Sequence, residues 1–306
     1  MCYTFSFPME QVRLAKFIAQ TGYAARRKAE ELILAGGVTV NGNPATTVTT
    51  FINPDVDRVE IFGQPCTKPE HNLYIALHKP SGYLSTTTGD SRKKVPDLLP
   101  KEATEGRRLF LVGRLDKETE GLIVLTDDGD FAQRLMHPSF EKEKEYEVIV
   151  RGRMDEKAAT TLRNGVDIIV EGKPYHTYPA KVEHLTSDGK TSRFHITLGE
   201  GKKRQIRLMC AAVGHPVRYL RRVRIGSLEL GDLPLGKYRL LSEQERQGLM
   251  KNAAGRLPPS FPQSFLCQKY CTFFCTALVP CSVFSLSVVC FSARFQHGML
   301  SRTSEP

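Results

Sequence analysis

The chain has 306 residues, of which 41% are hydrophobic and 25% are charged, and its formal net charge is +10. This length is typical of about two domains, and the apolar fraction excludes a chain that is disordered throughout. The positive charge is unusual for an enzyme of acidic metabolites and ordinary for a protein that contacts phosphate backbones.

Two helices are predicted near the N-terminus. Apolar residues recur on one face from Val12 to Ile18, and a break follows at Thr21-Gly22. A second apolar stripe covers residues 24–34, and both spacings are typical of amphipathic helices. Gly36-Gly37 then ends the second helix.

A hairpin follows these helices, because Asn41-Gly42 is a strong turn dipeptide between extended runs. Residues 59–62 are predicted as a strand of the same unit, and the polar residues 68–71 as a linker. We therefore expect a first domain at residues 10–68.

Strands and helices alternate in a second predicted domain at residues 72–254. Strands are expected at residues 73–77, 109–112, 121–126, 144–150, 180–184, 192–198 and 223–228. Helices are expected at residues 131–136, 156–163, 204–212 and 243–252. This order favours the α+β class, with a mixed, largely antiparallel sheet.

Residues 255–306 differ in kind and contain five of the eight cysteines. The stretch 272–291 carries no charge and is long enough to cross a bilayer, but Pro280 and several Ser and Thr residues interrupt it. We expect a cysteine-rich, apolar extension without a catalytic role, with a membrane or interface segment as the alternative.

The cysteines form no Cys-x-x-Cys pair and His-Glu-x-x-His is absent, so the usual zinc signatures are missing. Residues 1–10 lack the basic and apolar regions of a signal peptide. We therefore expect a cytoplasmic protein with free thiols and no metal site.

A basic triplet, Arg26-Arg27-Lys28, stands at the start of the second predicted helix, where backbone N–H groups also favour anions. By itself such a triplet is most often a solvated surface. Together with the hairpin, however, residues 13–31 and 37–42 resemble the S4 RNA-binding fold. The resemblance implies phosphate contacts that fix position on RNA, from Arg13, Lys16, Arg26, Arg27 and Lys28.

Three stretches of the second domain are candidates for the chemistry. In the first, Asp116 lies in a loop that Gly113 and Gly121 bracket, although a lone aspartate there is typical of a turn. In the second, Lys144 and Tyr146 share one side of a predicted strand. A tyrosine ring there can stack on an unpaired base, although an ordinary half-buried strand tyrosine is more common.

The third stretch is a run of positive charge between residues 202 and 224 that contains no acidic residue. Because a solvated helix face normally mixes signs, this run favours a phosphate-binding stripe. Arg204 and Arg207 are expected near one face of its helix. The run comprises Lys202, Lys203, Arg204, Arg207, Arg218, Arg221, Arg222 and Arg224.

In this order and spacing, the three stretches resemble the motifs of the ribosomal RNA pseudouridine synthases that pair an S4 domain with a catalytic domain. Four further segments match the family: residues 79–82, 95–99, 127–130 and 213–216. The family has an A-type branch, for small-subunit RNA, and a B-type branch, for large-subunit RNA, and the chain looks nearest the B-type branch. This placement depends on Arg204-Gln205-Ile206-Arg207 and Gly231-Asp232-Leu233-Pro234.

The resemblance implies site-specific isomerisation of uridine to pseudouridine during ribosome maturation, in large-subunit ribosomal RNA rather than small-subunit RNA. Such enzymes cut the glycosidic bond, rotate the uracil and rejoin it through carbon, without a cofactor or metal. Asp116 matches the catalytic aspartate, and whether it attacks the sugar or abstracts a proton stays open. Tyr146 matches the tyrosine that stacks on the base. Arg207 matches a basic residue that would pair with Asp116 and keep it ionised.

The implied partner is structured ribosomal RNA whose target uridine is flipped out of its stack, bound by a monomer. Leu208 departs from the family pattern, since a second basic residue is expected there. The alternative function is a non-catalytic RNA-binding factor of ribosome assembly, which retention of all three catalytic candidates argues against. Further RNA contacts are expected from Arg114, Lys144, Lys202, Lys203, Arg204 and Arg222.

Overall fold

The computed structural model describes residues 11–87, 93–137 and 142–251. The described residues all belong to one compact unit of the chain, residues 1–254. The predicted apolar extension therefore lies outside the described residues, as does the N-terminal segment 1–10. In the part of the chain that is described, no helix is long and apolar enough to cross a membrane.

The N-terminal elements enclose a small core of their own, formed by side chains such as Leu14, Ile18, Ile33 and Ile61. The strands β3-β2-β5-β6 form one sheet, and β1 pairs with β4. The elements are β1 (Val12–Arg13), α1 (Leu14–Gln20), α2 (Arg26–Leu34), β2 (Val38–Val40), β3 (Asn43–Pro44), β4 (Phe51–Ile52), β5 (Val59–Ile61) and β6 (Gln64–Pro65).

Two local predictions for this part have different outcomes. The Asn41-Gly42 turn is confirmed: φ is +52° and +80° at these residues, and they join the paired strands β2 and β3, as a two-residue hairpin turn requires. The helical prediction for Val12 is wrong. Val12 pairs with Ile52 in β1, because the backbone stays extended through Arg13 and α1 begins only at Leu14.

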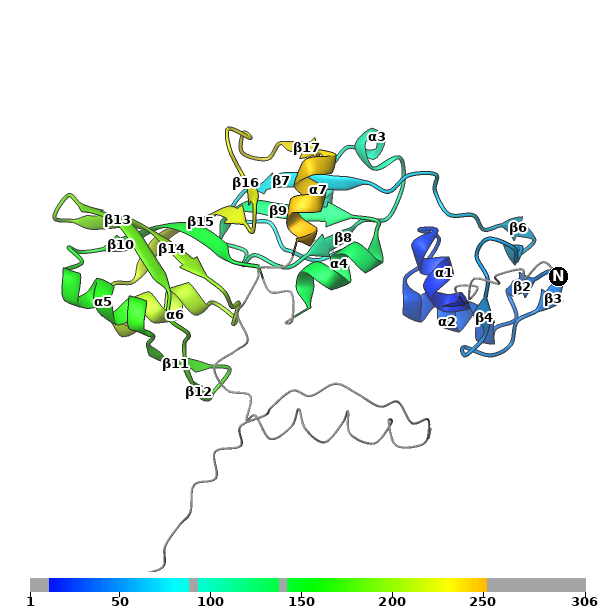
Figure 1. Cartoon of the computed structure of the whole chain (residues 1–306), viewed down its shortest axis with the longest axis horizontal. Coiled ribbons are helices and arrows are strands. Elements are labelled where there is room, and N and C mark those ends of the chain that lie inside the picture. Colours follow the sequence, from blue (N-terminus) through cyan, green and yellow to red (C-terminus); the bar gives the residue numbers. More distant parts are fainter. Residues whose placement is uncertain (1–10, 88–92, 138–141, 252–306) are drawn as a thin grey trace, which may run out of the picture. The chain divides into compact units, whose positions relative to one another are not determined.

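The second part is built on one nine-stranded sheet, in the order β13-β14-β10-β15-β9-β7-β17, with β16 beside β15 and β8 beside β9 (Figure 1). Its described pairs are antiparallel except β9 with β15, which is parallel. The predicted α+β class with a mixed, largely antiparallel sheet is thereby confirmed. The strands are β7 (Tyr74–Lys79), β8 (Phe110–Val112), β9 (Glu120–Thr126), β10 (Lys144–Arg151), β13 (Lys181–Ser187), β14 (Thr191–Leu198), β15 (Val217–Ile225), β16 (Leu228–Glu229) and β17 (Tyr238–Leu240).

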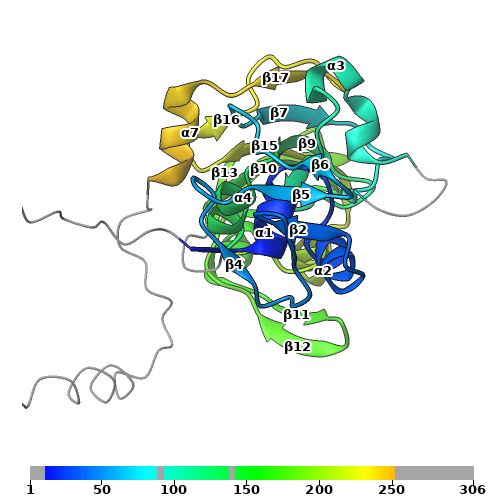
Figure 2. The same ribbon diagram turned by 90° about the vertical axis from the view of Figure 1, so that its right-hand side faces the viewer.

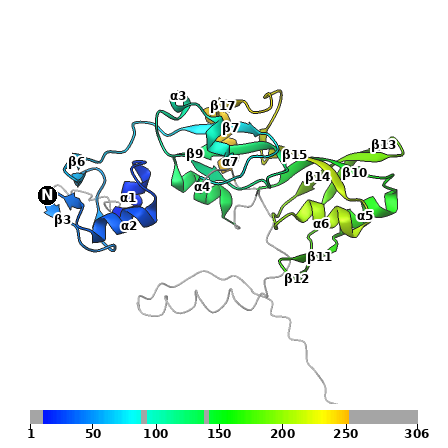
Figure 3. The same ribbon diagram turned by 180° about the vertical axis from the view of Figure 1, so that it is seen from behind.

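Helices cover the two halves of this sheet. Helices α5 (Glu156–Asn164) and α6 (Gln205–Ala212) lie on the same side of β10 and β14 (Figure 3). Figure 2 shows α3 (Lys101–Thr104), which follows the 3-10 turn η1 (Val95–Leu98), and α7 (Glu243–Met250) on opposite sides of β7 and β17. Helix α4 (Gly129–Met136) contacts β8.

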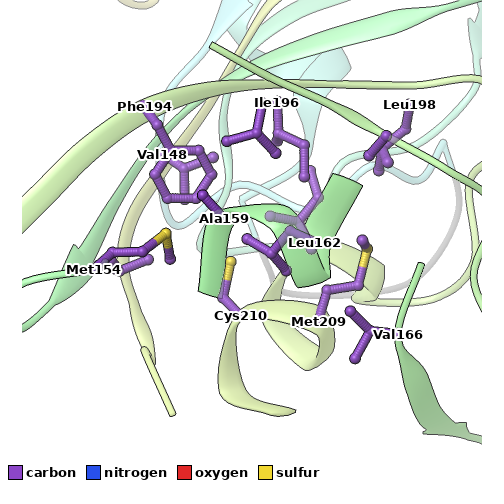
Figure 4. Packing of buried hydrophobic residues seen from close by; sticks show 14 of the residues in the cluster. Val148, Met154, Ala159, Leu162, Val166, Phe194, Ile196, Leu198, Met209 and Cys210 are labelled. Atoms are coloured by element: carbon purple, nitrogen blue, oxygen red, sulfur yellow. The ribbon is translucent and has the colours of Figure 1, made fainter. Parts of the chain in front are cut away.

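Alternation along the strands explains the core under α5 and α6. Val148, Phe194 and Ile196 point into a cluster with Leu162 and Met209 (Figure 4). The residues between them on the strands belong to the opposite face, because successive strand side chains alternate. One half of the sheet therefore has an apolar face under the helices and a polar face opposite.

Several boundaries differ from those predicted. Strand β15 begins at Val217, six residues before the predicted 223, and Gly226 (φ +55°) turns the chain into β16. Polar Arg and Tyr side chains along β15 obscure its apolar pattern in the sequence. The hairpin β11 (Asp167–Val170) and β12 (Lys173–His176) has no counterpart among the predicted elements.

Gly121 provides a test of the parallel contact between β9 and β15. A Cβ at this position would lie 2.2 Å from the Arg222 carbonyl oxygen and 2.5 Å from its nitrogen, and φ is +111°. Gly121→Ala should therefore lower the free energy of unfolding by about 2 kcal/mol or more, since backbone strain adds to overpacking. Urea denaturation measures the change.

Gly199→Ala is the matched control, because its Cβ would meet nothing within 4 Å and its φ is ordinary. It should change stability by less than about 1 kcal/mol. Equal effects of the two substitutions would contradict the packing argument.

Candidate active site

Lys79, at the end of β7, is fully buried, with an exposed fraction of 0%. Its Nζ donates to the backbone carbonyl oxygens of Pro80 (3.0 Å), Asp116 (3.1 Å), Lys117 (3.2 Å) and Thr119 (2.7 Å). Burial lowers its pKa from 10.5 to about 8, while the carboxylates of nearby acidic residues act in the opposite direction. In the sequence, Lys79 stands out only as part of a family motif, since nothing in its pattern marks a buried ammonium.

Asp116 lies in the loop between β8 and β9, and it is half-buried. Its carbonyl oxygen accepts from Lys79 Nζ and from the Thr119 amide (3.1 Å), so its backbone is fixed. Its carboxylate has no hydrogen-bond or ion-pair partner among the described residues. Asp116 lines a cleft together with residues of β8, β10 and β15, so the carboxylate can act on a molecule bound there.

Tyr146 lines the same cleft from β10. Its ring is half-buried and contacts the apolar clusters on both sides of the cleft. Lys144 also lines the cleft, as expected from its position on the same strand face. Asp116 and Tyr146 therefore line the same cleft although 30 positions separate them in the sequence.

Arg207 approaches the Asp116 loop from α6. Its Nη2 donates to the Glu118 carbonyl oxygen (3.2 Å) and to Thr119 Oγ1 (3.4 Å). No ion pair joins it to Asp116 in the described residues, so the expected direct pair is wrong for this structure: its guanidinium is bound to the loop instead. Burial lowers the pKa of Arg207, with Arg204 acting in the same direction, whereas the Asp116 and Glu118 charges raise it.

Arg204 reaches the same loop without being part of α6. It is the residue before the helix, with φ +55°, and its Nη1 lies 3.4 Å from Glu118 Oε2. The pKa of Glu118 is lowered by its own backbone amide and by Arg204 and Arg207. The two arginines thus hold the outer part of the loop, and Lys79 holds its inner part.

The predicted stripe of positive charge is divided between two faces of the sheet. Lys202, Lys203 and Arg204 are exposed and line the cleft, as does Arg114. Arg221 instead pairs with Glu147 (2.7 Å), and Arg224 pairs with Glu145 (2.8 Å). Because acidic residues of β10 neutralise these two arginines, the stripe is shorter than the sequence indicates.

Arg222 also differs from the predicted exposed stripe, because its side chain is buried, with an exposed fraction of 2%.

The cationic residues predicted to bind RNA in the N-terminal part lie closer to their expected positions. Arg26, Arg27 and Lys28 form the exposed first turn of α2. Arg13 is exposed just before α1, and Lys16 is half-buried on it.

The described residues contain no cluster of potential metal ligands. Among residues 11–87, 93–137 and 142–251, no group of three or more His, Cys, Asp or Glu side chains is placed to hold a metal ion. Four carboxylates line the cleft, those of Asp116, Asp130, Glu171 and Glu200. Asp130, Glu171 and Glu200 have side-chain partners, whereas Asp116 has none in the described residues.

The lowered pKa of Lys79 predicts how the free energy of unfolding changes with pH. Between about pH 8 and pH 10.5 the folded protein has lost this proton while the unfolded chain keeps it. The unfolded state then binds more protons, so this group makes the free energy of unfolding rise with pH in that window. Lys79→Met should abolish this rise, and it should destabilise the protein because the four carbonyl oxygens lose their donor.

The measurement is urea denaturation of wild type and Lys79→Met between pH 7 and pH 10. Lys190→Met, in the exposed turn between β13 and β14, is the control and should leave the change of stability with pH as it is in wild type. If the difference in stability between wild type and Lys79→Met does not change with pH, the buried lysine is not titrating as proposed.

Comparison with known proteins agrees with this geometry. Residues 73–212 match the family model of RNA pseudouridylate synthases, and residues 12–55 match the S4 domain. The chain is 39% identical over 245 residues to an uncharacterized RNA pseudouridine synthase of Aquifex aeolicus (strain VF5), across 79% of this chain and 95% of that protein.

Two further relatives are informative. Ribosomal large subunit pseudouridine synthase B of Bacillus subtilis (strain 168) is 39% identical over 235 residues, which is 76% of this chain and 93% of that protein. A solved crystal structure of a pseudouridylate synthase has a TM-score of 0.55 and 30% identity, across 78% of this chain and 99% of that one. The chain therefore belongs to the RNA pseudouridine synthase family, as an isomerase with an S4 RNA-binding domain before its catalytic domain.

Proposed function

We propose that this chain makes pseudouridine at a specific uridine of large-subunit ribosomal RNA. Its likeness to the large subunit pseudouridine synthase of Bacillus subtilis supports this choice of RNA. The B-type motifs at residues 204–207 and 231–234 support the same choice.

Asp116 is the proposed catalytic carboxylate. The observation that carries this role is its half-buried carboxylate in the cleft, which has no partner in the described residues, on a backbone that Lys79 holds. A carboxylate in this position can add to the electron-poor sugar carbon or stabilise positive charge there while the glycosidic bond breaks. Its fixed backbone favours the reaction because a preorganised group needs little rearrangement.

Tyr146 is proposed to stack on the target base, which must leave its helix to reach Asp116. Flipping a base costs a few kcal/mol, and stacking on an aromatic ring recovers about 1–3 kcal/mol. Phosphate contacts from the exposed cations of the cleft and of α2 offset the remainder. Arg207 is proposed as a positioning residue, because its hydrogen bonds run to the loop next to Asp116.

Asp116→Asn tests the catalytic role. It should abolish pseudouridine formation, by a factor of about 10³ or more, while RNA affinity changes little because phosphate contacts dominate it. Conversion of unmodified ribosomal RNA transcripts and filter binding measure the two properties. Asp188→Asn, in the exposed turn between β13 and β14, is the control and should keep full activity. Full activity of Asp116→Asn would end the proposal.

The choice of RNA is tested by mapping pseudouridines in ribosomal RNA from cells with and without this protein. We expect one or more sites of large-subunit RNA to disappear, and to return with wild-type protein but not with Asp116→Asn. Loss confined to small-subunit RNA, or no loss in ribosomal RNA, would contradict the proposed substrate.

A further inference from the structure

Arg222 is a buried cation in the wall of the cleft, and its hydrogen bonds are incomplete. Its Nε donates to the Leu122 carbonyl oxygen (2.8 Å), which fixes the side chain against β9. Its Nη2 is excluded from water and has no hydrogen-bond partner in the described residues. No carboxylate of those residues forms an ion pair with it, unlike Arg221 and Arg224 on the same strand.

This incomplete bonding is costly in the free protein. A buried donor without an acceptor costs about 1–3 kcal/mol, and more when it is charged. The Nε hydrogen bond alone is enough to hold the side chain against β9. This structural role therefore does not explain why the terminal Nη2 is buried without a partner in the described residues. When the side chain turns toward the cleft that Arg222 lines, an acceptor of the substrate can reach this nitrogen, which removes the cost and strengthens binding.

The surroundings of Arg222 indicate which part of a nucleotide supplies the acceptor. Arg222 and Tyr146 are direct partners on neighbouring strands, so their side chains share one face of the sheet. Both line the cleft, together with apolar residues Leu220, Ile206 and Leu198. A flat apolar object with a polar edge, such as a base stacked on Tyr146, fits this combination better than a hydrated phosphate.

Four other cations of the cleft are placed differently. Arg114, Lys202, Lys203 and Arg204 are exposed, where they can meet phosphates that remain in water. Arg222 alone among these arginines and lysines is almost completely buried, and the base is the part of a flipped nucleotide that enters deepest.

We infer that Arg222 recognises the target base, by donating a hydrogen bond from its terminal guanidinium nitrogens to a carbonyl oxygen of the uracil stacked on Tyr146. The charge pattern of the sequence had predicted phosphate binding for Arg222. The inference rests on the isomerase activity of the family and not on which RNA carries the target, so the rRNA assignment can fail without affecting it.

Three small probes separate base contact from phosphate contact: uridine, uridine 5′-monophosphate and ribose 5-phosphate. Their affinities for the full chain are measured by NMR titration for wild type and Arg222→Met. We expect Arg222→Met to weaken uridine and uridine 5′-monophosphate equally, by about tenfold or more, which is the worth of a charged hydrogen bond. Ribose 5-phosphate should be unaffected.

Arg114→Met is the matched control from the exposed part of the cleft. It should weaken the two phosphate-containing probes and leave uridine unchanged. Losses for Arg222→Met that are confined to the phosphate-containing probes, or equal affinities of wild type and Arg222→Met for every probe, would overturn the inference.

A second measurement covers the case in which Arg222→Met does not fold. In wild type, the Arg222 side-chain nitrogen resonances should shift on addition of uridine and not on addition of ribose 5-phosphate, with Arg222→Lys used to assign them. Unshifted Arg222 signals at saturating uridine, or no uridine binding by wild type, would also overturn it. Neither experiment uses ribosomal RNA, so their failure is distinct from failure of the proposed substrate.

Discussion

The Lys79 ammonium donates to four backbone carbonyl oxygens, three of which belong to the loop from Asp116 to Thr119. Bringing a lysine out of water costs several kcal/mol, and its lowered pKa reflects that cost. The carbonyl dipoles and the nearby acidic residues offset it. The loop is therefore fixed by its backbone, and the Asp116 carboxylate does not have to contribute to holding it.

The parallel contact between β9 and β15 brings the remaining site residues to that loop. Only two residue pairs form it, Arg221 with Glu120 and Arg222 with Gly121, and the absence of a side chain at Gly121 lets the two backbones approach. Strand β9 follows the Asp116 loop, and β15 pairs with the strand that carries Tyr146. The Asp116 loop and the Tyr146 ring come from opposite halves of the sheet, and this contact between β9 and β15 joins the two halves.

Much of this arrangement could be predicted from the sequence, where local pattern decides the structure. Asn41-Gly42 specifies its turn by φ alone, and the alternation around Val148 and Phe194 specifies one buried face. Arg222 could not be placed, because a strand arginine next to other arginines has the same local pattern whether it lies inside or outside. Its burial depends on Gly121, about a hundred positions away. Likewise, Arg207 was expected to pair with Asp116, but the Glu118 carbonyl and Thr119 hydroxyl compete for its guanidinium.

The same reasoning explains why one run of positive charge has several functions. A strand sends alternate residues to opposite faces, so Arg222 lines the cleft and Arg221 does not. Arg221 is neutralised by Glu147 on the face away from α5 and α6, where it stabilises the sheet and leaves little charge for RNA. Arg222 lies on the cleft face with no carboxylate partner in the described structure, so its charge is directed to a ligand. Whether Arg221 and Arg222 are available to a ligand is therefore set by the acidic residues on their two strand faces, and not by the density of Lys and Arg along the sequence.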